Sequence, residues 1–228
     1  MRFFALTGAF IALSAPAFSQ SRTLTQGAHR MEIKLERLDG DSWKSVDPSL
    51  VLSQGDRIRF RFKTNFDGYL YVMNLSSSGK YEQLFPREET GDQNRIAANQ
   101  EYQVPSNSSR FRIDGPEGYE TVYWLVTPAR LTEAPPRPAA PPNTSPSKPP
   151  TLIPRCDDAI LQVRAQCIDH AAGPRLMARG ETLPQNLPPA AAQGPRDLLF
   201  LRQQDTSIIS SPEPLTGPLI YEFRLAHR

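Results

Sequence analysis

Cys156 and Cys167 are the residues whose type and spacing raise the sharpest chemical question. In an oxidising compartment, two such cysteines usually form a disulfide. Eleven residues along a straight helix rise about 16 Å, however, whereas the Cα atoms of bridged cysteines lie within about 7 Å of each other. The segment therefore either folds back and is bridged, or forms a helix with Cys156, Ile160, Val163 and Cys167 on one face. We favour the disulfide, because exported free thiols are vulnerable to oxidation.

The other residues that could do chemistry form no constellation in the sequence. His29, His170 and His227 lie far apart, and none belongs to the i, i+4 pair typical of zinc ligands on a helix. Also absent are the Cys-x-x-Cys of redox dithiols, the Gly-x-Ser-x-Gly of serine hydrolases and a glycine-rich phosphate loop. We therefore expect no cofactor, no metal site and no enzymatic activity. The alternative is a small hydrolase in which folding brings distant carboxylates together.

Four cations alternate along one short segment at Arg57, Arg59, Arg61 and Lys63. On one face of a strand they would attract an anionic envelope polymer or an acidic partner. The simpler interpretation, which we favour, is a solvated face with Glu32 and Glu36 as cross-strand partners. The whole chain has 26 basic and 24 acidic residues, a formal charge of +2. This near balance argues against nucleic acid as the partner, because phosphate binding needs a concentrated basic surface.

These cations alternate with Ile58, Phe60 and Phe62, and a period of two over seven residues is typical of a half-buried strand. Residues 69–75 are apolar at nearly every position, which predicts a strand covered on both faces. Other strands are expected at residues 31–35, 43–46, 81–85, 101–104, 110–113, 121–127, 197–202 and 219–225. Strands repeated about every ten residues and separated by turn residues predict a mainly β, Ig-like antiparallel β-sandwich.

The composition divides the chain into segments. Residues 30–130 form the main part of the sandwich, and residues 134–154, with nine prolines, form a disordered excursion. Residues 155–196 are an insertion with one short helix and the two cysteines. Residues 197–228 return to the sandwich, because a lone terminal strand would expose its apolar face. That face carries Leu219, Tyr221, Phe223 and Leu225.

Residues 1–19 have the organisation of a secretory signal peptide. A positive start at Arg2 precedes the apolar residues 3–13, and small residues at Ala17 and Ser19 suit cleavage before Gln20. The apolar run of about 11 residues is shorter than the roughly 20 that cross a bilayer, and no later stretch comes close. The sequence predicts an exported protein, periplasmic or extracellular, without a transmembrane segment after cleavage.

A set of turn and core motifs runs through the first half of the chain: Gly55-Asp56, Asn65, Asp67-Gly68-Tyr69-Leu70-Tyr71, Gly79, Leu84-Phe85-Pro86, Asn94-Arg95-Ile96, Val104-Pro105 and residues 116–118. Over about residues 32–128 the sequence resembles the bacterial domain-of-unknown-function family 4384. The closing residues 220–228 also resemble the terminal strand of secreted members. The resemblance implies an exported bacterial β-sandwich module, which in larger members is often appended to caspase-like peptidase or protein-kinase modules. It implies no known catalytic activity.

The signal, the strand pattern and the missing catalytic constellation together lead to one expectation about function. We expect an exported, non-enzymatic β-sandwich that binds a protein or polymer of the bacterial cell envelope. A polar cleft with at least two convergent carboxylates of shifted pKa would favour the hydrolase instead.

Overall fold

The computed structural model describes residues 29–88, 93–106, 108–131, 152–175, 177, 198–211 and 217–228. The expected signal peptide at residues 1–19 lies outside these residues. So do most of the proline-rich excursion and the part of the insertion between residues 178 and 196. No helix within the described ranges is long and apolar enough to cross a membrane.

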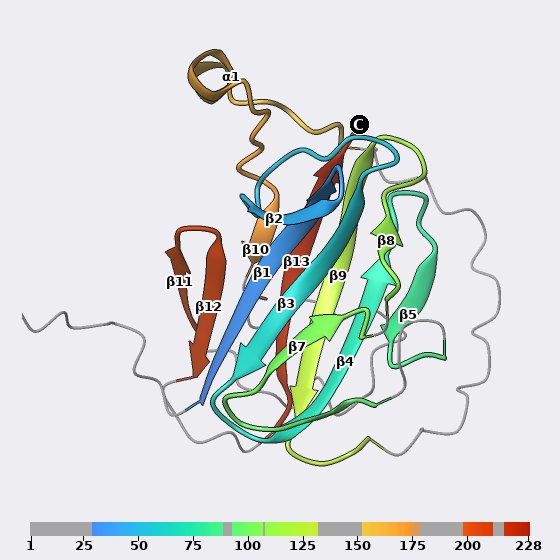
Figure 1. The fold of residues 1–228 in the computed structure, drawn as a ribbon, viewed down its shortest axis with the longest axis vertical. Helices are drawn as coiled ribbons and strands as arrows, with labels where there is room; N and C mark the ends of the chain where they lie inside the picture. The colour runs from blue at the N-terminus through green and yellow to red at the C-terminus, as the bar shows by residue number, and fades with distance from the viewer. Residues whose placement is uncertain are drawn as a thin grey trace, which may run out of the picture.

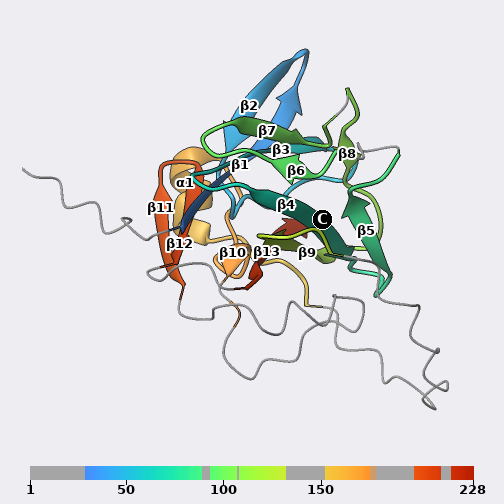
Figure 2. The same cartoon turned by 90° about the horizontal axis from the view of Figure 1, so that it is seen from below.

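The described residues form two antiparallel sheets that pack face to face as a β-sandwich (Figure 1 and Figure 2). The first sheet contains, in spatial order, β11 (Leu199–Gln203), β12 (Thr206–Ser211), β1 (His29–Asp39), β3 (Arg57–Thr64) and β7 (Glu101–Val104), with β2 (Ser42–Val46) also paired to β1 and β8 (Phe111–Arg112) to β3. The second contains β10 (Gly173–Arg175), β13 (Leu219–His227), β9 (Gly118–Thr127), β4 (Gly68–Leu75) and β5 (Tyr81–Phe85), with β6 (Arg95–Ile96) also paired to β4. The mainly β sandwich predicted from the sequence is confirmed.

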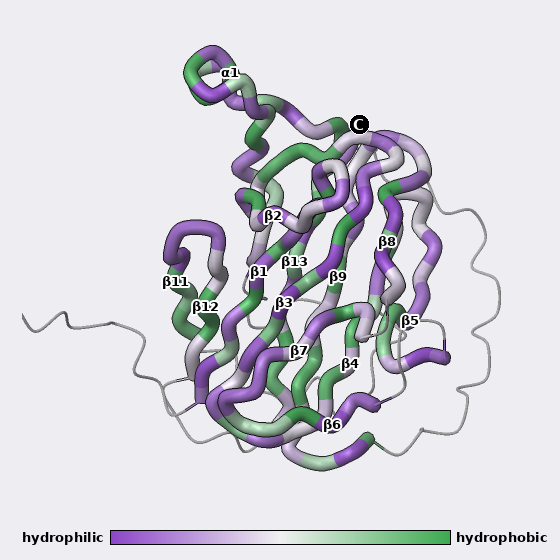
Figure 3. The backbone as a smooth tube through the Cα atoms, in the orientation of Figure 1, coloured by the Kyte–Doolittle hydropathy of each residue, from purple (hydrophilic) through white to green (hydrophobic). Residues whose placement is uncertain are grey.

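The hydrophobic core lies between the sheets and follows the alternation of the sequence, which Figure 3 shows as changing hydropathy along β3. Ile58, Phe60 and Phe62 of β3 all point inward and are at most 1% exposed. The Phe60 ring lies 5.1 Å from the Trp124 ring of β9 in an edge-to-face contact, a favourable arrangement of aromatic rings. The prediction that Phe60 and Phe62 are core residues is confirmed.

The C-terminal strand β13 lies inside the second sheet, between β10 and β9. It pairs with β9 over its whole length, from Leu219 opposite Val126 to His227 opposite Gly118. Tyr221 and Phe223 are fully buried in the same core cluster as the β3 side chains. The C-terminal strand therefore supplies one wall of the core built by the first half of the chain.

Several elements differ from the sequence prediction. The strand expected at residues 197–202 is β11, and β12, which follows it across a two-residue turn, was not predicted. Gly173–Arg175 forms the short strand β10 in a segment expected to be irregular, because β13 offers it a free edge to pair with. β4 is less evenly covered than expected, since Tyr69 and Tyr71 stay partly exposed on its outer face.

Candidate functional site

The basic residues of β3 lie on the outer face of the first sheet, and two of them are engaged in ion pairs. Arg59 Nε lies 2.5 Å from Glu36 Oε2 on the neighbouring strand, and its Nη1 donates to Gln103 Oε1 at 2.9 Å. Arg61 lies 3.4 Å from the same Glu36 oxygen and 2.8 Å from Glu101. The Arg59 side chain is only 13% exposed. Glu36 is thus one of the cross-strand partners that the sequence suggested.

The two remaining cations of the stripe lie at its ends. Arg57 is exposed and stands opposite Arg112 of β8 in the register. Lys63 stands between Glu32 on β1 and Glu101 on β7. Glu36 and Glu101 therefore neutralise Arg59 and Arg61 at the centre of the stripe. Little unpaired positive charge remains there to attract a polyanion.

The two cysteines are joined in a disulfide with their Cα atoms 4.7 Å apart. The chain between them folds back around α1 (Asp158–Arg164), which begins where Asp157 caps the Ile160 N–H and ends at Ala165 in the left-handed conformation. The alternative of one continuous helix with four residues on its inner face is wrong. The helix has only seven residues, none of them buried, and its Val163 is 84% exposed instead of facing the sandwich.

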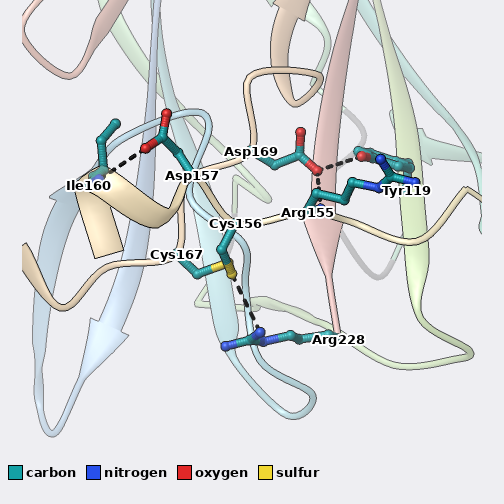
Figure 4. The surroundings of a disulfide bond; sticks show 8 residues. All are labelled: Tyr119, Arg155, Cys156, Asp157, Ile160, Cys167, Asp169 and Arg228. Atoms are coloured by element: carbon teal, nitrogen blue, oxygen red, sulfur yellow. Dashed lines mark hydrogen bonds between the residues drawn. A yellow bond between two sulfur atoms is a disulfide. The ribbon is translucent and has the colours of Figure 1, made fainter. Parts of the chain in front are cut away.

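Asp169 fastens this bridged loop to the sandwich (Figure 4). Its carboxylate accepts hydrogen bonds from the Tyr119 hydroxyl at 2.6 Å and from the backbone N–H groups of Arg155 and Ala171 at 2.7 and 2.8 Å. Burial opposes ionisation of Asp169, but these hydrogen bonds outweigh it and lower the pKa of the carboxyl. Burial and the hydrogen bond to Asp169 raise the pKa of Tyr119 to about 12.

β11 forms the outer edge of the first sheet and carries three consecutive exposed apolar side chains. Leu199, Phe200 and Leu201 are 50%, 39% and 37% exposed. Figure 3 shows a hydrophobic stretch along β11 at the rim of the sheet. Among the described residues, no strand pairs with the outer side of β11. An exposed apolar edge strand is a feature that proteins usually protect, so this edge is a candidate binding surface.

A pocket of about 280 Å³ lies between the two sheets, near the edge strands β5 and β8. Phe60, Leu84, Phe111 and Val122 contribute apolar walls, and Arg112 and Asp114, 3.1 Å apart, lie among the lining residues. The sequence analysis did not identify this pocket, because its lining comes from six strands distributed along the chain.

Glu120 of β9 lines the pocket as part of a buried polar cluster with Asn74 of β4 and His227 of β13. Glu120 Oε2 accepts from Asn74 Nδ2 at 2.7 Å, and Oε1 accepts from the Ser77 backbone N–H at 3.0 Å and lies 3.4 Å from His227 Nε2. Burial would raise the pKa of Glu120, but the nearby His227 side chain and the hydrogen bonds from Ser77 and Asn74 together lower it. A carboxylate held in its ionised form suits binding of a donor or cation better than donation of a proton.

The structure does not bring the predicted site residues together. The disulfide lies at one end of the sandwich, the cations of β3 lie on the outer face of one sheet, and the pocket lies between the sheets. Across the residues that the structure describes, no group of three or more His, Cys, Asp or Glu side chains is arranged to hold a metal ion.

Residues 51–130 match a protein-family model described as Domain of unknown function (DUF4384). This part of the chain is similar to that family. This match confirms the resemblance seen in the sequence, although it begins at residue 51 rather than near residue 32. The DUF4384 match covers strands β3 to β9. β1, β12 and β13 lie outside the match, although they pair with those strands or with each other in the same sandwich. No curated protein and no solved structure matches the chain.

Proposed function

We propose that this chain is an exported, non-enzymatic module that binds a protein of the bacterial cell envelope, adding an extended segment of that protein to β11. The carrying observation is the open apolar edge formed by Leu199, Phe200 and Leu201. Addition of a strand to a sheet edge is a common mode of peptide recognition, in which backbone hydrogen bonds give affinity and alternate side chains give specificity.

Export is supported by two features of different kinds. Residues 1–19 have the organisation of a signal peptide. The disulfide between Cys156 and Cys167 is a bond that persists in oxidising compartments such as the periplasm or the extracellular space.

The hairpin geometry determines which backbone groups of β11 face a partner. Gln203 pairs with Thr206 across the two-residue turn, so these two residues form a hydrogen-bonded pair and the pattern alternates from there. By this alternation the N–H groups of Phe200 and Arg202 point away from β12, toward the outer edge. Arg202, the one charged residue of the strand, forms an ion pair with Asp47. Within the described ranges, the edge is therefore apolar and its outward backbone donors have no partner.

The side chains of β11 also restrict the partner. Leu199 and Leu201 lie on one face of the strand and Phe200 lies on the other, because successive side chains alternate. An incoming segment would meet apolar side chains on both faces, so we expect apolar residues at consecutive positions of that segment and no charges opposite them. An anionic polymer is a poorer fit, since the cations at the centre of β3 are already paired with Glu36 and Glu101.

Site-specific photocrosslinking in the native envelope tests this proposal. A photoreactive phenylalanine analogue replaces Phe200, and a matched variant carries it at Lys44, an exposed position on β2. We expect one protein adduct from position 200 and none from position 44. Phe200→Pro should abolish complex formation, because proline removes an outward N–H without breaking the pairs with β12.

The outcome separates the alternatives. A crosslink between two copies of this chain would show self-association, and retention on an anionic polymer would show polymer binding. Either result would replace the proposed protein partner. Persistence of the adduct in a folded Phe200→Pro protein would also contradict strand addition, as would identical labelling from positions 200 and 44.

A further inference from the structure

The pocket between the sheets lies at the opposite side of the sandwich from the β11 edge, as the positions of β5, β8 and β11 in Figure 1 show. A ligand in it would therefore not compete with a partner on β11. Its volume of about 280 Å³ is near the lower limit of small-molecule sites. Leu84 and Phe111 are only partly buried, and both pack against the core. The pocket thus offers apolar surface to a small molecule at this side of the sandwich.

The polar residues of the pocket favour a ligand that donates hydrogen bonds. Asn74 is nine-tenths buried, and its amide nitrogen donates to Glu120 Oε2. A carboxylate can only accept, so this hydrogen bond fixes the amide orientation and leaves Asn74 Oδ1 as an acceptor. Asn74 Oδ1 is buried and accepts no hydrogen bond. A buried acceptor without a donor is costly, and such a group in a native structure calls for an explanation.

The charged side chains that line the pocket also favour a ligand that donates hydrogen bonds. Glu82, Asp114 and Glu120 contribute three carboxylates, and Arg112 contributes one cation. Arg112 is paired with Asp114, and Glu82 is paired with Lys80 outside the pocket. Glu120 has hydrogen-bond donors around it but no lysine or arginine partner among the described residues. A cation that reaches a buried carboxylate stabilises its negative charge.

We propose that this pocket binds a small amphipathic primary amine, with its ammonium group directed toward Glu120 and Asn74 and its alkyl chain against Leu84 and Phe111. The ammonium group supplies a permanent positive charge beside Glu120, whose one ion-pair partner among the described residues is His227. It also brings three donors for nearby acceptors such as Asn74 Oδ1. The alkyl chain removes apolar surface from water. An anion of the same shape is excluded by Glu120, and a neutral alcohol gains the apolar contact without the charge.

The probes are n-pentylammonium, n-pentanol and n-pentanoate, titrated into the full-length mature protein and followed by calorimetry and by NMR chemical shifts. We expect n-pentylammonium to bind at least tenfold more tightly than n-pentanol, and n-pentanoate not to bind. The shifts should concentrate on Leu84, Phe111 and Val122. Equal affinity for the amine and the alcohol would overturn the assignment of the ammonium site, and preference for pentanoate would overturn the proposal altogether.

Two variants locate the site. Glu120→Gln should weaken amine binding at least tenfold and reduce the difference between amine and alcohol. Leu84→Trp should fill the pocket and abolish binding of both the amine and the alcohol. This variant gives an independent test if Glu120→Gln fails to fold. Leu161→Trp on α1 is the matched control, because this leucine is 38% exposed and far along the chain from the pocket residues. Unchanged binding in Leu84→Trp, or equal loss in Leu161→Trp, would contradict the proposed location.

Discussion

The guanidinium carbon of Arg59 lies 4.3 Å from the centre of the Trp43 ring. The same guanidinium bonds to Glu36 and Gln103, so a residue that alternation alone assigns to a solvated face is largely covered. Stacking of a cation on an aromatic ring and a charge-assisted hydrogen bond each add stability. These contacts make Arg59 part of the packing on the outer face of the first sheet.

We therefore predict that Arg59→Ala lowers the free energy of unfolding by about 1 to 3 kcal/mol, because Glu36 and Gln103 lose a charged partner. Substitution of an ordinary solvated surface residue changes the free energy of unfolding by less than about 0.5 kcal/mol. Arg57→Ala is the control, since Arg57 is exposed and faces Arg112. Reversible denaturant titration measures both, and equal small effects would show that the Arg59 contacts add nothing.

Phe60→Ala should lower the free energy of unfolding by about 3 to 5 kcal/mol, as truncation of a buried aromatic residue usually does. Phe60 is fully buried and packs edge to face on both Trp124 and Phe223. The denaturant midpoint should fall accordingly. A loss below about 1 kcal/mol would mean that the core closes over the missing ring or that the inner face is assigned wrongly.

Removal of the disulfide by replacing Cys156 and Cys167 with serine should cost about 2 to 4 kcal/mol, because the unfolded chain regains the freedom of the closed loop. Val163→Ser in the same loop is a suitable control, since Val163 is exposed and should change stability by less than about 0.5 kcal/mol. Thermal unfolding with and without reductant gives a second measurement. An unchanged melting temperature in reductant would contradict this expectation.

Acid should weaken the cluster around Glu120. The folded state lowers the pKa of Glu120 below its ordinary value of 4.5, so the unfolded state takes up the proton first as the pH falls. The stabilisation is complete above about pH 4.5 and is lost as the pH falls through the lower folded-state pKa. Glu120→Gln should therefore destabilise the protein more at pH 7 than at pH 3. A destabilisation that is independent of pH would contradict this prediction.

Removal of residues 217–228 should unfold the protein, because β13 lies inside the second sheet and buries Tyr221 and Phe223. Deletion of residues 135–150 should change stability little, since the free energy of loop closure changes by only about 0.6 kcal/mol per doubling of loop length. Circular dichroism and denaturant titration distinguish the two variants. A fragment of residues 20–134 as stable as the mature chain would show that β13 is dispensable.

Alternation of apolar and polar residues predicted the strands at residues 57–63 and 219–225 well, because each pairs with a neighbour on both sides and buries one full face. It also carried a signal for the pocket. Glu120 shares the inward parity of Val122 and Trp124, and His227 shares that of Phe223 and Leu225. Because the predicted strand began at residue 121, Glu120 fell outside it and its inward direction was missed.

The remaining features depend on contacts that a local pattern does not contain. β10 is a strand because β13 offers it an edge, and β12 is one because β1 pairs with it far away in sequence. The closeness of Asn74, Glu120 and His227 follows from the order of β4, β9 and β13 in the sheet. The sequence leaves the disulfide as one of two alternatives, because its local pattern does not show that the chain reverses after Arg164.

The pairing of β1 with β12 joins the first strand of the sandwich to its last but one, with His29 opposite Ser211. β9 likewise pairs with a strand far away in sequence, because its partner β13 ends one residue before the C-terminus. Contacts between residues so distant in sequence slow folding, because the chain must find them after paying a large search entropy. The growing chain therefore completes the first sheet only after β12 emerges and the second only after β13 emerges. We expect slow folding, in which both sheets stay open until these distant strands pair.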